Sequence, residues 1–385
     1  MTTAPRSIFG PEHDLFRNAV RQFVDREVLP NTEKWRTQGR VDRSLFEAAG
    51  KAGFMGMAAP VEFGGGGNDD IRYSVILSEC FAESDVMVEG LGLTLQTDMA
   101  LPYLIHHCSP QQAAAWIPDA IKGRTILALA ISEPGAGSDI AGIKTTAKRV
   151  GDEYVLNGSK TFITNALNAD LILVAAKTRP GPGHDAISLI AVEASRRGLS
   201  RGRKLEKVGQ ASADTADLFF DDVKIPAANL LGPEGGGFHI LMEHLAQERL
   251  IVAVQAVAQA RRAFEHAVEY ARHRQAFGQA IGRFQNTRFT LAEMKTDIDV
   301  GRVYVDDAIS RYASGDLDES GAAQAKLWST EMCQRVVDRA VQIHGGYGYM
   351  LEYPVARAWA DTRVQTIYAG TSEMMKEIIG RSLGL

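Results

Sequence analysis

The hydrophobic period of this 385-residue chain changes twice, and this change constrains the fold more than any other feature. Apolar residues recur at helical spacing over residues 1–123. They give way to short β-branched or apolar runs over residues 124–234, and helical spacing returns over residues 235–385. The pattern predicts an α+β protein of three domains, in the order helices, strands, helices.

The sequence of the middle part predicts an antiparallel β domain, folded either as a barrel or as a sandwich. Its strand-like runs are separated by Gly, Pro, Asn and Asp clusters and lie at residues 125–130, 154–156, 171–174 and 187–190. No stretch between them is long and periodic enough to form the crossover helix of a parallel dinucleotide-binding sheet. We expect ligands to bind in clefts where this β domain meets the helical layers.

Composition excludes several classes of protein. The net charge is -5 and no long Lys/Arg run occurs, so the positive field that nucleic acid requires is missing. The N-terminus lacks a basic segment followed by an apolar one, and no run approaches the roughly 18 apolar residues that cross a bilayer, which predicts a cytoplasmic protein. Cys80, Cys108 and Cys333 are far apart and outside any CxxC spacing, so we expect free thiols and no metal site.

One acidic residue lies in an apolar helical stripe. Leu241, Leu245, Glu248 and Val252 fall along one face of a helix. Burial of an unpaired carboxylate is costly, so Glu248 should either form an ion pair or have a raised pKa, at which a carboxylate becomes an effective proton acceptor. A structural ion pair and a catalytic base both remain open. Arg249 projects about 100° away and is not the natural same-face partner.

Several segments of small residues could let a ligand approach the backbone closely. They are EPGAGSD at 133–139, HGGYGY at 344–349 and YAGTSE at 368–373. Phe162 could cover a planar ring and Thr164 could hydrogen-bond a heteroatom, although a strand Phe more often packs in a core. The basic residues 272–274 end a long helix, where they could bind phosphate or cap the helix. Each motif is weak when taken alone.

Taken together, in this order and at these separations, the segments resemble the acyl-CoA dehydrogenase family over essentially the whole chain. The resemblance rests on AISEPGAGSD (130–139), GDEYVLNGSKTFITNA (151–166), LAQERL (245–250), RHRQAFGQ (272–279), QIHGGYGYMLEYP (342–354) and IYAGTSE (367–373). It implies a helical N-terminal domain, a central β domain and a C-terminal four-helix bundle. It also implies a homotetramer, or at least a homodimer, with one FAD per subunit.

The resemblance also implies which residues bind the cofactor and the substrate. The FAD contacts within one subunit are Ser132, Gly137, Ser138, Phe162, Thr164, Thr371 and Glu373. The FAD contacts from the neighbouring subunit are Arg274, Phe277, Gln285, Gln342 and Gly346. The substrate contacts are Ser138, Arg249, Tyr368, Ala369 and Gly370. Leu95, Thr97 and Met99 are candidates for the acyl pocket, although helical core packing is the commoner role for any one of them.

The position of the base departs from the commoner pattern. Many family members have the catalytic glutamate in an IYEGT arrangement, where this chain has Ala369, which cannot accept a proton. A minority, including the long-chain and isovaleryl types, has the base at the position matched by Glu248. The resemblance therefore implies that Glu248 removes the α proton of an acyl-CoA while hydride leaves the β carbon for flavin N5, which yields the trans-2-enoyl thioester. The implied electron acceptor is an electron-transferring flavoprotein.

Three alternatives remain open from the sequence. The same chemistry could act on an acyl chain attached to a carrier protein. Related monooxygenases react their reduced flavin with oxygen and need no base at position 248. A non-catalytic flavin-binding homologue is suggested by Ala369, and such a protein would be yellow but would not bleach with any acyl thioester.

Overall fold

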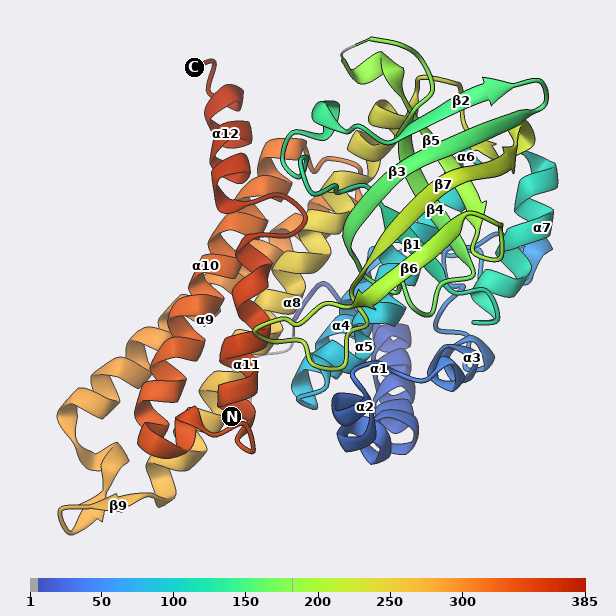
Figure 1. The fold of residues 1–385 in the computed structure, drawn as a ribbon. Helices are drawn as coiled ribbons and strands as arrows, with labels where there is room; N and C mark the ends of the chain where they lie inside the picture. Colours follow the sequence, from blue (N-terminus) through green and yellow to red (C-terminus); the bar gives the residue numbers. More distant parts are fainter. Residues whose placement is uncertain (1–5, 182) are drawn as a thin grey trace.

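The computed structural model describes residues 6–181 and 183–385, and its first part is helical (Figure 1). The N-terminal helices are α1 (Pro11–Phe23), α2 (Thr32–Gln38), α3 (Arg43–Lys51), α4 (Ile71–Glu83), α5 (Met87–Thr94), α6 (Leu101–His107) and α7 (Pro110–Ile121). A π-helical segment, Leu95–Ala100, joins α5 directly to α6. Such segments interrupt the regular helical ladder and occur frequently at functional sites.

The central part forms one mixed sheet of eight strands. The strands are β1 (Leu127–Ala130), β2 (Thr146–Val150), β3 (Glu153–Ile163), β4 (Leu171–Lys177), β5 (Ile187–Glu193), β6 (Leu199–Lys204), β7 (Ala216–Pro226) and β8 (Leu230–Leu231). Their order is β6-β7-β3-β2-β4-β5-β8, with β1 beside β4. In the part of the chain that the structure describes, β6 and β8 do not pair, so the sheet is open and not a closed barrel.

The sheet is mostly antiparallel, as expected, but strand β4 also has parallel neighbours. Strand β4 pairs in parallel with the whole of β1, through its residues 171–174, and with β2 at a single position, Thr146 opposite Lys177. A parallel pair needs a long crossover connection. Here the β2–β3 hairpin and its flanking loops connect β1 to β4, in place of the crossover helix whose absence had argued against parallel pairing.

The sheet is bent at the β2–β4 contact, so its two halves pack face to face like a sandwich. Side chains of β3 and β7, such as Leu156 and Phe220, share a core with Ile172 and Val174 of β4. The opposite face of β4 and β5 packs on α6, α7 and the first turns of α8 (Gly237–His273). Because β4 and β5 are covered on both faces, their sequences are continuous apolar runs.

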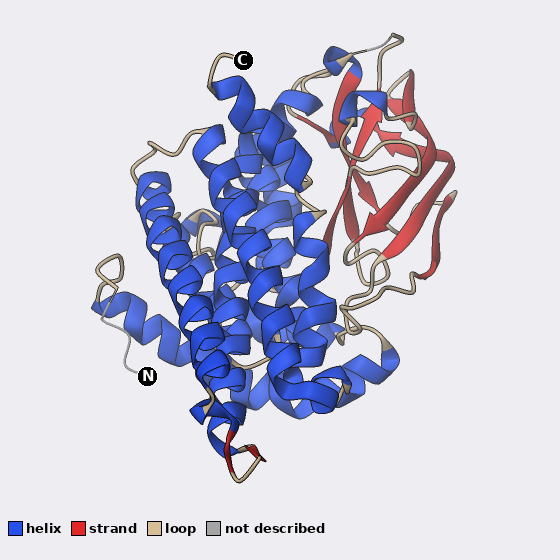
Figure 2. Ribbon diagram, turned by 90° about the vertical axis from the view of Figure 1, so that its left-hand side faces the viewer, coloured by secondary structure: helices blue, strands red, loops and turns tan. Residues whose placement is uncertain are grey.

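The C-terminal part is a helical bundle (Figures 1 and 2). Its long helices are α8, α9 (Gln285–Ala313) and α10 (Glu319–His344). The fourth position of the predicted bundle is divided between two short helices, α11 (Pro354–Thr362) and α12 (Ser372–Ser382), which both contact α10. Helix α4 of the N-terminal part also packs on α8, with Ile71 and Val75 in the bundle core.

Two further expectations from composition bear on the described residues. Cys80 and Cys333 are buried free thiols, as predicted, and Cys108 is half-buried. None of the helices in the described ranges combines the length and the apolar character needed to cross a membrane.

Candidate active site

Glu248 of α8 is buried and hydrogen-bonded to a tyrosine. Its side chain is 6% exposed, and the Tyr103 hydroxyl of α6 donates to its Oε1 at 3.0 Å. Among residues 6–181 and 183–385 no cation forms an ion pair with this carboxylate. Burial raises the pKa of Glu248 to about 7, because it outweighs the Tyr103 hydrogen bond and the charge of Arg249, both of which lower the pKa. Of the two readings of the helical stripe, the structure favours the one with a raised pKa.

Arg249 is buried beside the base but directed elsewhere. Its Nη1 donates to Glu319 Oε1 at the start of α10, at 3.0 Å, which agrees with its projection away from the Glu248 face. Its Nε is buried without a hydrogen-bond partner in the described part of the molecule. Arg249 therefore places a positive charge next to the site without neutralising the base.

A histidine pair supports the ring of Tyr103. His244, one turn before Glu248 on α8, lies with its ring centroid 4.4 Å from that of Tyr103, and its Nε2 is 3.1 Å from His107 Nε2. Burial lowers the pKa of His244 to about 4, and burial also lowers the pKa of His107. The pair is therefore neutral at physiological pH and adds no positive charge near Glu248.

The small-residue loop after β1 is fixed to β3 by a buried ion pair. Lys160 Nζ donates to Glu133 Oε1 at 2.9 Å and to the Ile131 carbonyl at 2.8 Å. The Thr161 N–H donates to the Ser132 carbonyl at 2.9 Å. These contacts place half-buried Ser132 and exposed Gly137 and Ser138 beside the end of β3. A Cβ at Gly137 would meet nothing within 4 Å, so the surface of this loop is open to a ligand.

Phe162 projects from β3 toward solvent. The pairing register of β3 with β7 shifts between Lys160 and Ile163, and at this irregularity Phe162 has φ +61 and is 70% exposed. A left-handed conformation is unfavourable for a bulky residue and is typical of functional sites. Phe162 is therefore not the core residue that strand statistics favour. Thr164, two residues later, is half-buried.

The turn between α11 and α12 places two left-handed residues in succession. Ala369 has φ +50 and Gly370 has φ +94, and the buried Lys326 of α10 donates to the Gly370 carbonyl. The Thr371 side chain then caps α12 by accepting from the Met374 N–H at 3.3 Å, and Glu373 is exposed in the first turn. Tyr368, Ala369 and Gly370 are each half-buried.

The predicted contacts from a neighbouring subunit lie at the far end of the bundle. Arg274 is 26 positions after Glu248, which at the helical rise corresponds to about 39 Å along α8. Arg274, Phe277, Gln285, Gln342 and Gly346 are all exposed. One chain cannot bring these residues and Glu248 to the same flavin ring. The structure therefore separates the predicted FAD contacts into two groups.

The predicted acyl-pocket residues lie in the π-helical segment. Leu95 is buried and Met99 is half-buried, and both pack in the cluster that contains Leu241 of α8. Thr97 instead lines a cavity of about 770 Å³ between α4, α6, α8 and the end of α9. Another cavity, of about 1110 Å³, lies where the three parts of the chain meet, as expected for a ligand cleft, but none of the predicted site residues lines it.

The sequence reasoning missed Tyr103, His244 and Lys326. Tyr103 could not be told from a core aromatic residue by its spacing. Lys326 did have a signal, because it is a single cation that follows Ala322, Ala323 and Ala325 on a long helix, and the stripe argument that found Glu248 applies to it equally.

Comparisons with known proteins cover nearly the whole chain. Profiles of the acyl-CoA dehydrogenase N-terminal, middle and C-terminal domains match residues 10–124, 128–223 and 235–384. The long-chain specific acyl-CoA dehydrogenase of Rattus norvegicus is 43% identical, over 98% of this chain and 88% of its own length.

Solved structures give the same result. An acyl-CoA dehydrogenase from Geobacillus kaustophilus superposes with a TM-score of 0.96 at 45% identity, covering 99% of this chain and 100% of its own. A glutaryl-CoA dehydrogenase from Mycobacterium smegmatis in complex with FADH2 superposes with a TM-score of 0.90 at 25% identity, covering 98% and 95%.

Proposed function

Because the chain belongs to the acyl-CoA dehydrogenase family, we propose that Glu248 is the base that removes the α proton of its acyl-CoA substrate. The chain is an oxidoreductase, and its relatives support FAD-dependent α,β-dehydrogenation of an acyl-CoA thioester. The observation that carries the proposal is the buried Glu248 carboxylate with a pKa of about 7 on α8, together with Ala369 in the turn. No observation favours a carrier-protein substrate, an oxygenase or a non-catalytic homologue.

The residues around Glu248 suit proton abstraction. A base with a pKa near neutrality is largely ionised at slightly alkaline pH and still binds a proton strongly enough to remove it from carbon. Tyr103 donates to Oε1 and thereby fixes the orientation of the carboxylate. The apolar residues around α8 exclude water, which strengthens the electrostatic interactions in the site. The thioester oxygen would be hydrogen-bonded by backbone N–H groups of the Ala369–Gly370 turn.

The residues present fit an FAD. Phe162 offers an exposed ring in a strained conformation, and Gly137 leaves room that a side chain would fill. We propose that Ser132, Gly137, Ser138, Phe162 and Thr164 hold the flavin, and that Thr371 and Glu373 complete the site. When bound, FAD accepts the hydride that leaves the β carbon of the substrate.

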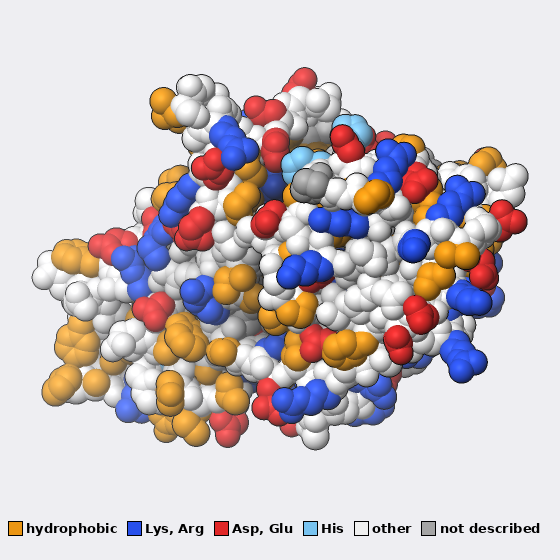
Figure 3. Space-filling model, turned by 45° about the horizontal axis from the view of Figure 1, so that its top comes forward, with side chains coloured by type: hydrophobic (Ala, Val, Ile, Leu, Met, Phe, Trp, Pro, Cys, Tyr) orange, Lys and Arg blue, Asp and Glu red, His pale blue; other side chains and the backbone are white. Residues whose placement is uncertain are grey.

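We further propose a homotetramer in which a second subunit completes each FAD site. Phe277 is 96% exposed, and Tyr349 and Leu351 of the adjoining segment are also exposed. Figure 3 shows hydrophobic side chains gathered on the left of the view, where the C-terminal helices lie. Exposed apolar patches of this kind mark interaction surfaces. Phe277→Asp should therefore yield a smaller particle in sedimentation that retains less FAD, and an unchanged tetramer with full FAD would contradict the proposal.

The proposed physiological electron acceptor is an electron-transferring flavoprotein.

The proposed function is tested by anaerobic titration of the FAD protein with saturated acyl-CoAs that differ in chain length and branching. We expect at least one of them to bleach the flavin absorbance and to form the enoyl thioester. A correctly folded, FAD-loaded protein that is bleached by no acyl-CoA in the panel would contradict it.

A further inference from the structure

A buried lysine is hydrogen-bonded to the turn between α11 and α12. Lys326 is 1% exposed in α10, and its Nζ donates to the Gly370 carbonyl. The hydrogen bond from this cation therefore fixes the turn that contains Ala369 and Gly370 to α10. Both turn residues have left-handed backbones, and in the described part of the chain their N–H groups make no backbone hydrogen bond. Successive N–H groups in such a turn form a concave site for a negatively charged oxygen.

Lys326 has a second cation as its charged neighbour. No carboxylate pairs with Lys326 anywhere in the described ranges. Its charged neighbour is Arg249, which adds to the effect of burial in lowering the pKa of Lys326 to about 8, so the lysine is still mostly protonated at pH 7. Glu319 pairs with Arg249 and is 60% exposed. Lys326 and Arg249 are thus two neighbouring buried cations, and Glu319 pairs with only one of them. Burial of an ammonium without an anionic partner is costly.

We propose that Lys326 is a positioning residue that fixes the Ala369–Gly370 turn and, with Arg249, supplies the positive potential that stabilises the enolate of the substrate. This inference rests on the proposed function. In the step concerned, the Cα–H bond breaks and its proton passes to Glu248 Oε. The electron pair forms the Cα=C bond, and the thioester oxygen becomes negative. A positive potential fixed before the reaction lowers the energy of that oxyanion without reorganisation.

The test uses the FAD-loaded enzyme and a 3-oxoacyl-CoA, which ionises to a stable enolate in the site without being dehydrogenated. The apparent pKa of the bound ligand is measured from the enolate absorbance as a function of pH. An opposite charge nearby shifts a pKa by about one to three units, so Lys326→Met should raise the pKa of the bound ligand by about one unit. Lys326→Arg should shift it less. Lys376→Met removes a lysine that is 60% exposed on α12 and should leave it unchanged.

The outcomes separate the inference from the proposed function. If the wild-type enzyme fails to ionise the bound ligand, the proposed function fails. If the wild type ionises it and loaded Lys326→Met gives the same pKa, only the role of Lys326 is overturned. Should Lys326→Met not retain FAD, Glu319→Gln replaces it at low ionic strength. Loss of the anion that offsets Arg249 should then lower the pKa of the ligand, and an unchanged or raised value would overturn the electrostatic role.

Discussion

Tyr103 donates a hydrogen bond to the Glu248 carboxylate, and this bond favours the charged form of the base. Since the carboxylate is the active form and its pKa is about 7, flavin bleaching by substrate should accelerate as the pH rises through 7. Tyr103→Phe keeps the ring but removes the donor. A hydrogen bond to a charged group contributes about 1.5–3 kcal/mol, so the pH profile should move to higher pH by about one unit.

Stopped-flow bleaching measured from pH 6 to pH 9 checks this prediction. Tyr304→Phe is the matched control, because it removes the Tyr304 hydroxyl that bonds to Gln324 on the surface of the bundle. A Tyr103→Phe profile that coincides with the wild type would show that Tyr103 does not set the pKa of the base.

At the scale of residues, the sequence predicted that Glu248 is buried with an unusual environment, but it did not predict its hydrogen-bond partner Tyr103. A carboxylate in an apolar stripe is recognisable because its burial conflicts with its charge. Tyr103 gives no such conflict, since a tyrosine ring in a core is ordinary and its hydroxyl acquires a role only when another helix approaches. Phe162 was left open between core and ligand, because strand spacing does not reveal the irregularity that turns its side chain outward.

The element that positions the predicted flavin contacts is β3, and it depends on the buried Lys160–Glu133 pair. Burial lowers the pKa of Lys160 to about 8, although Glu133 opposes the shift. Lys160→Met would leave the Glu133 carboxylate buried with hydrogen bonds from Lys144 and Thr145 but without its cationic partner. Removal of one member of a buried pair costs about 3–5 kcal/mol. We expect a lower melting temperature and weaker FAD retention.

Thermal unfolding followed by FAD fluorescence measures both effects. Lys148→Met on the neighbouring strand β2 removes an exposed lysine and should change neither. Full FAD retention by Lys160→Met at wild-type stability would mean that the pair does not position the loop.

At the scale of elements the sequence predicted which segments are helices and which are strands better than how the strands pair. The spacing of apolar residues along the sequence indicates whether a segment is a helix or a strand. The segments that form β4 and β5 are continuous apolar runs, which is typical of buried strands. Strand direction depends on which run pairs with which, and this is decided by the packing of the folded domain. The two parallel pairings of β4 were therefore not predictable from the period alone.

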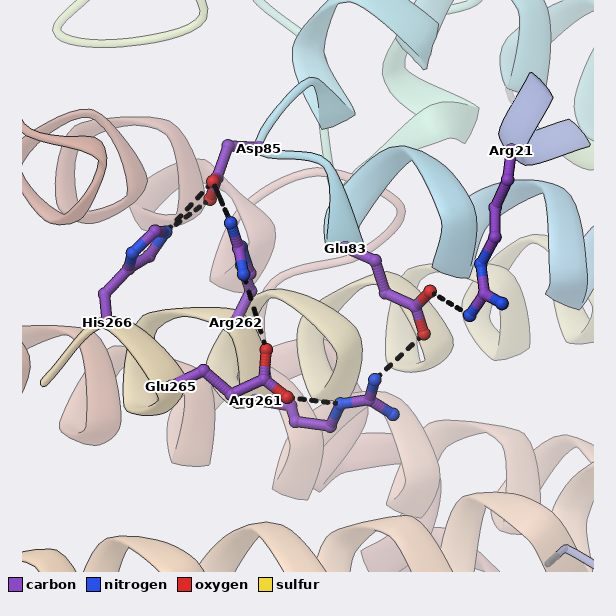
Figure 4. A network of polar contacts seen from close by, with 7 residues as sticks. All are labelled: Arg21, Glu83, Asp85, Arg261, Arg262, Glu265 and His266. Carbon is purple, nitrogen blue, oxygen red and sulfur yellow. Dashed lines mark hydrogen bonds and ion pairs between the residues drawn. The ribbon is translucent and has the colours of Figure 1, made fainter. Parts of the chain in front are cut away.

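Across the whole molecule, a charged network joins the N-terminal helices to α8 (Figure 4). The Glu83 carboxylate accepts hydrogen bonds from Arg21 of α1 and from Arg261 of α8, both at 2.9 Å. Asp85 accepts from Arg262 Nη2 at 2.8 Å and lies 2.9 Å from His266 Nε2. Burial opposes ionisation of Asp85, but the bonds from His266 and Arg262 outweigh it and hold its pKa below the ordinary value.

Asp85→Asn should destabilise the protein by about 2 kcal/mol, because it removes the charge from these hydrogen bonds. A carboxylate with a lowered pKa stabilises the folded state at pH values above its unfolded pKa, and this contribution is lost as the pH falls through the folded pKa. The difference in stability between wild type and variant, measured by urea unfolding, should therefore be full at pH 7 and shrink toward pH 3. Asp119→Asn, at an exposed pair, is the control. A difference that does not vary with pH would contradict this role.

At the largest scale the sequence predicted the order of the three parts, and only the resemblance predicted that two subunits share a cofactor site. The separation of Arg274 from Glu248 follows from the 37-residue length of α8, which no local motif reveals.

The central claim is that Glu248 is the base, and substitution of this residue in the FAD-loaded enzyme tests it most directly. Glu248→Gln keeps the size and burial of the side chain and should retain FAD. Glu269→Gln, on the same helix with its carboxylate 65% exposed, is the matched control. Under anaerobic conditions with an acyl-CoA that bleaches the wild type, we expect Glu269→Gln to bleach normally and Glu248→Gln to remain yellow. Undiminished bleaching of Glu248→Gln would contradict the assignment.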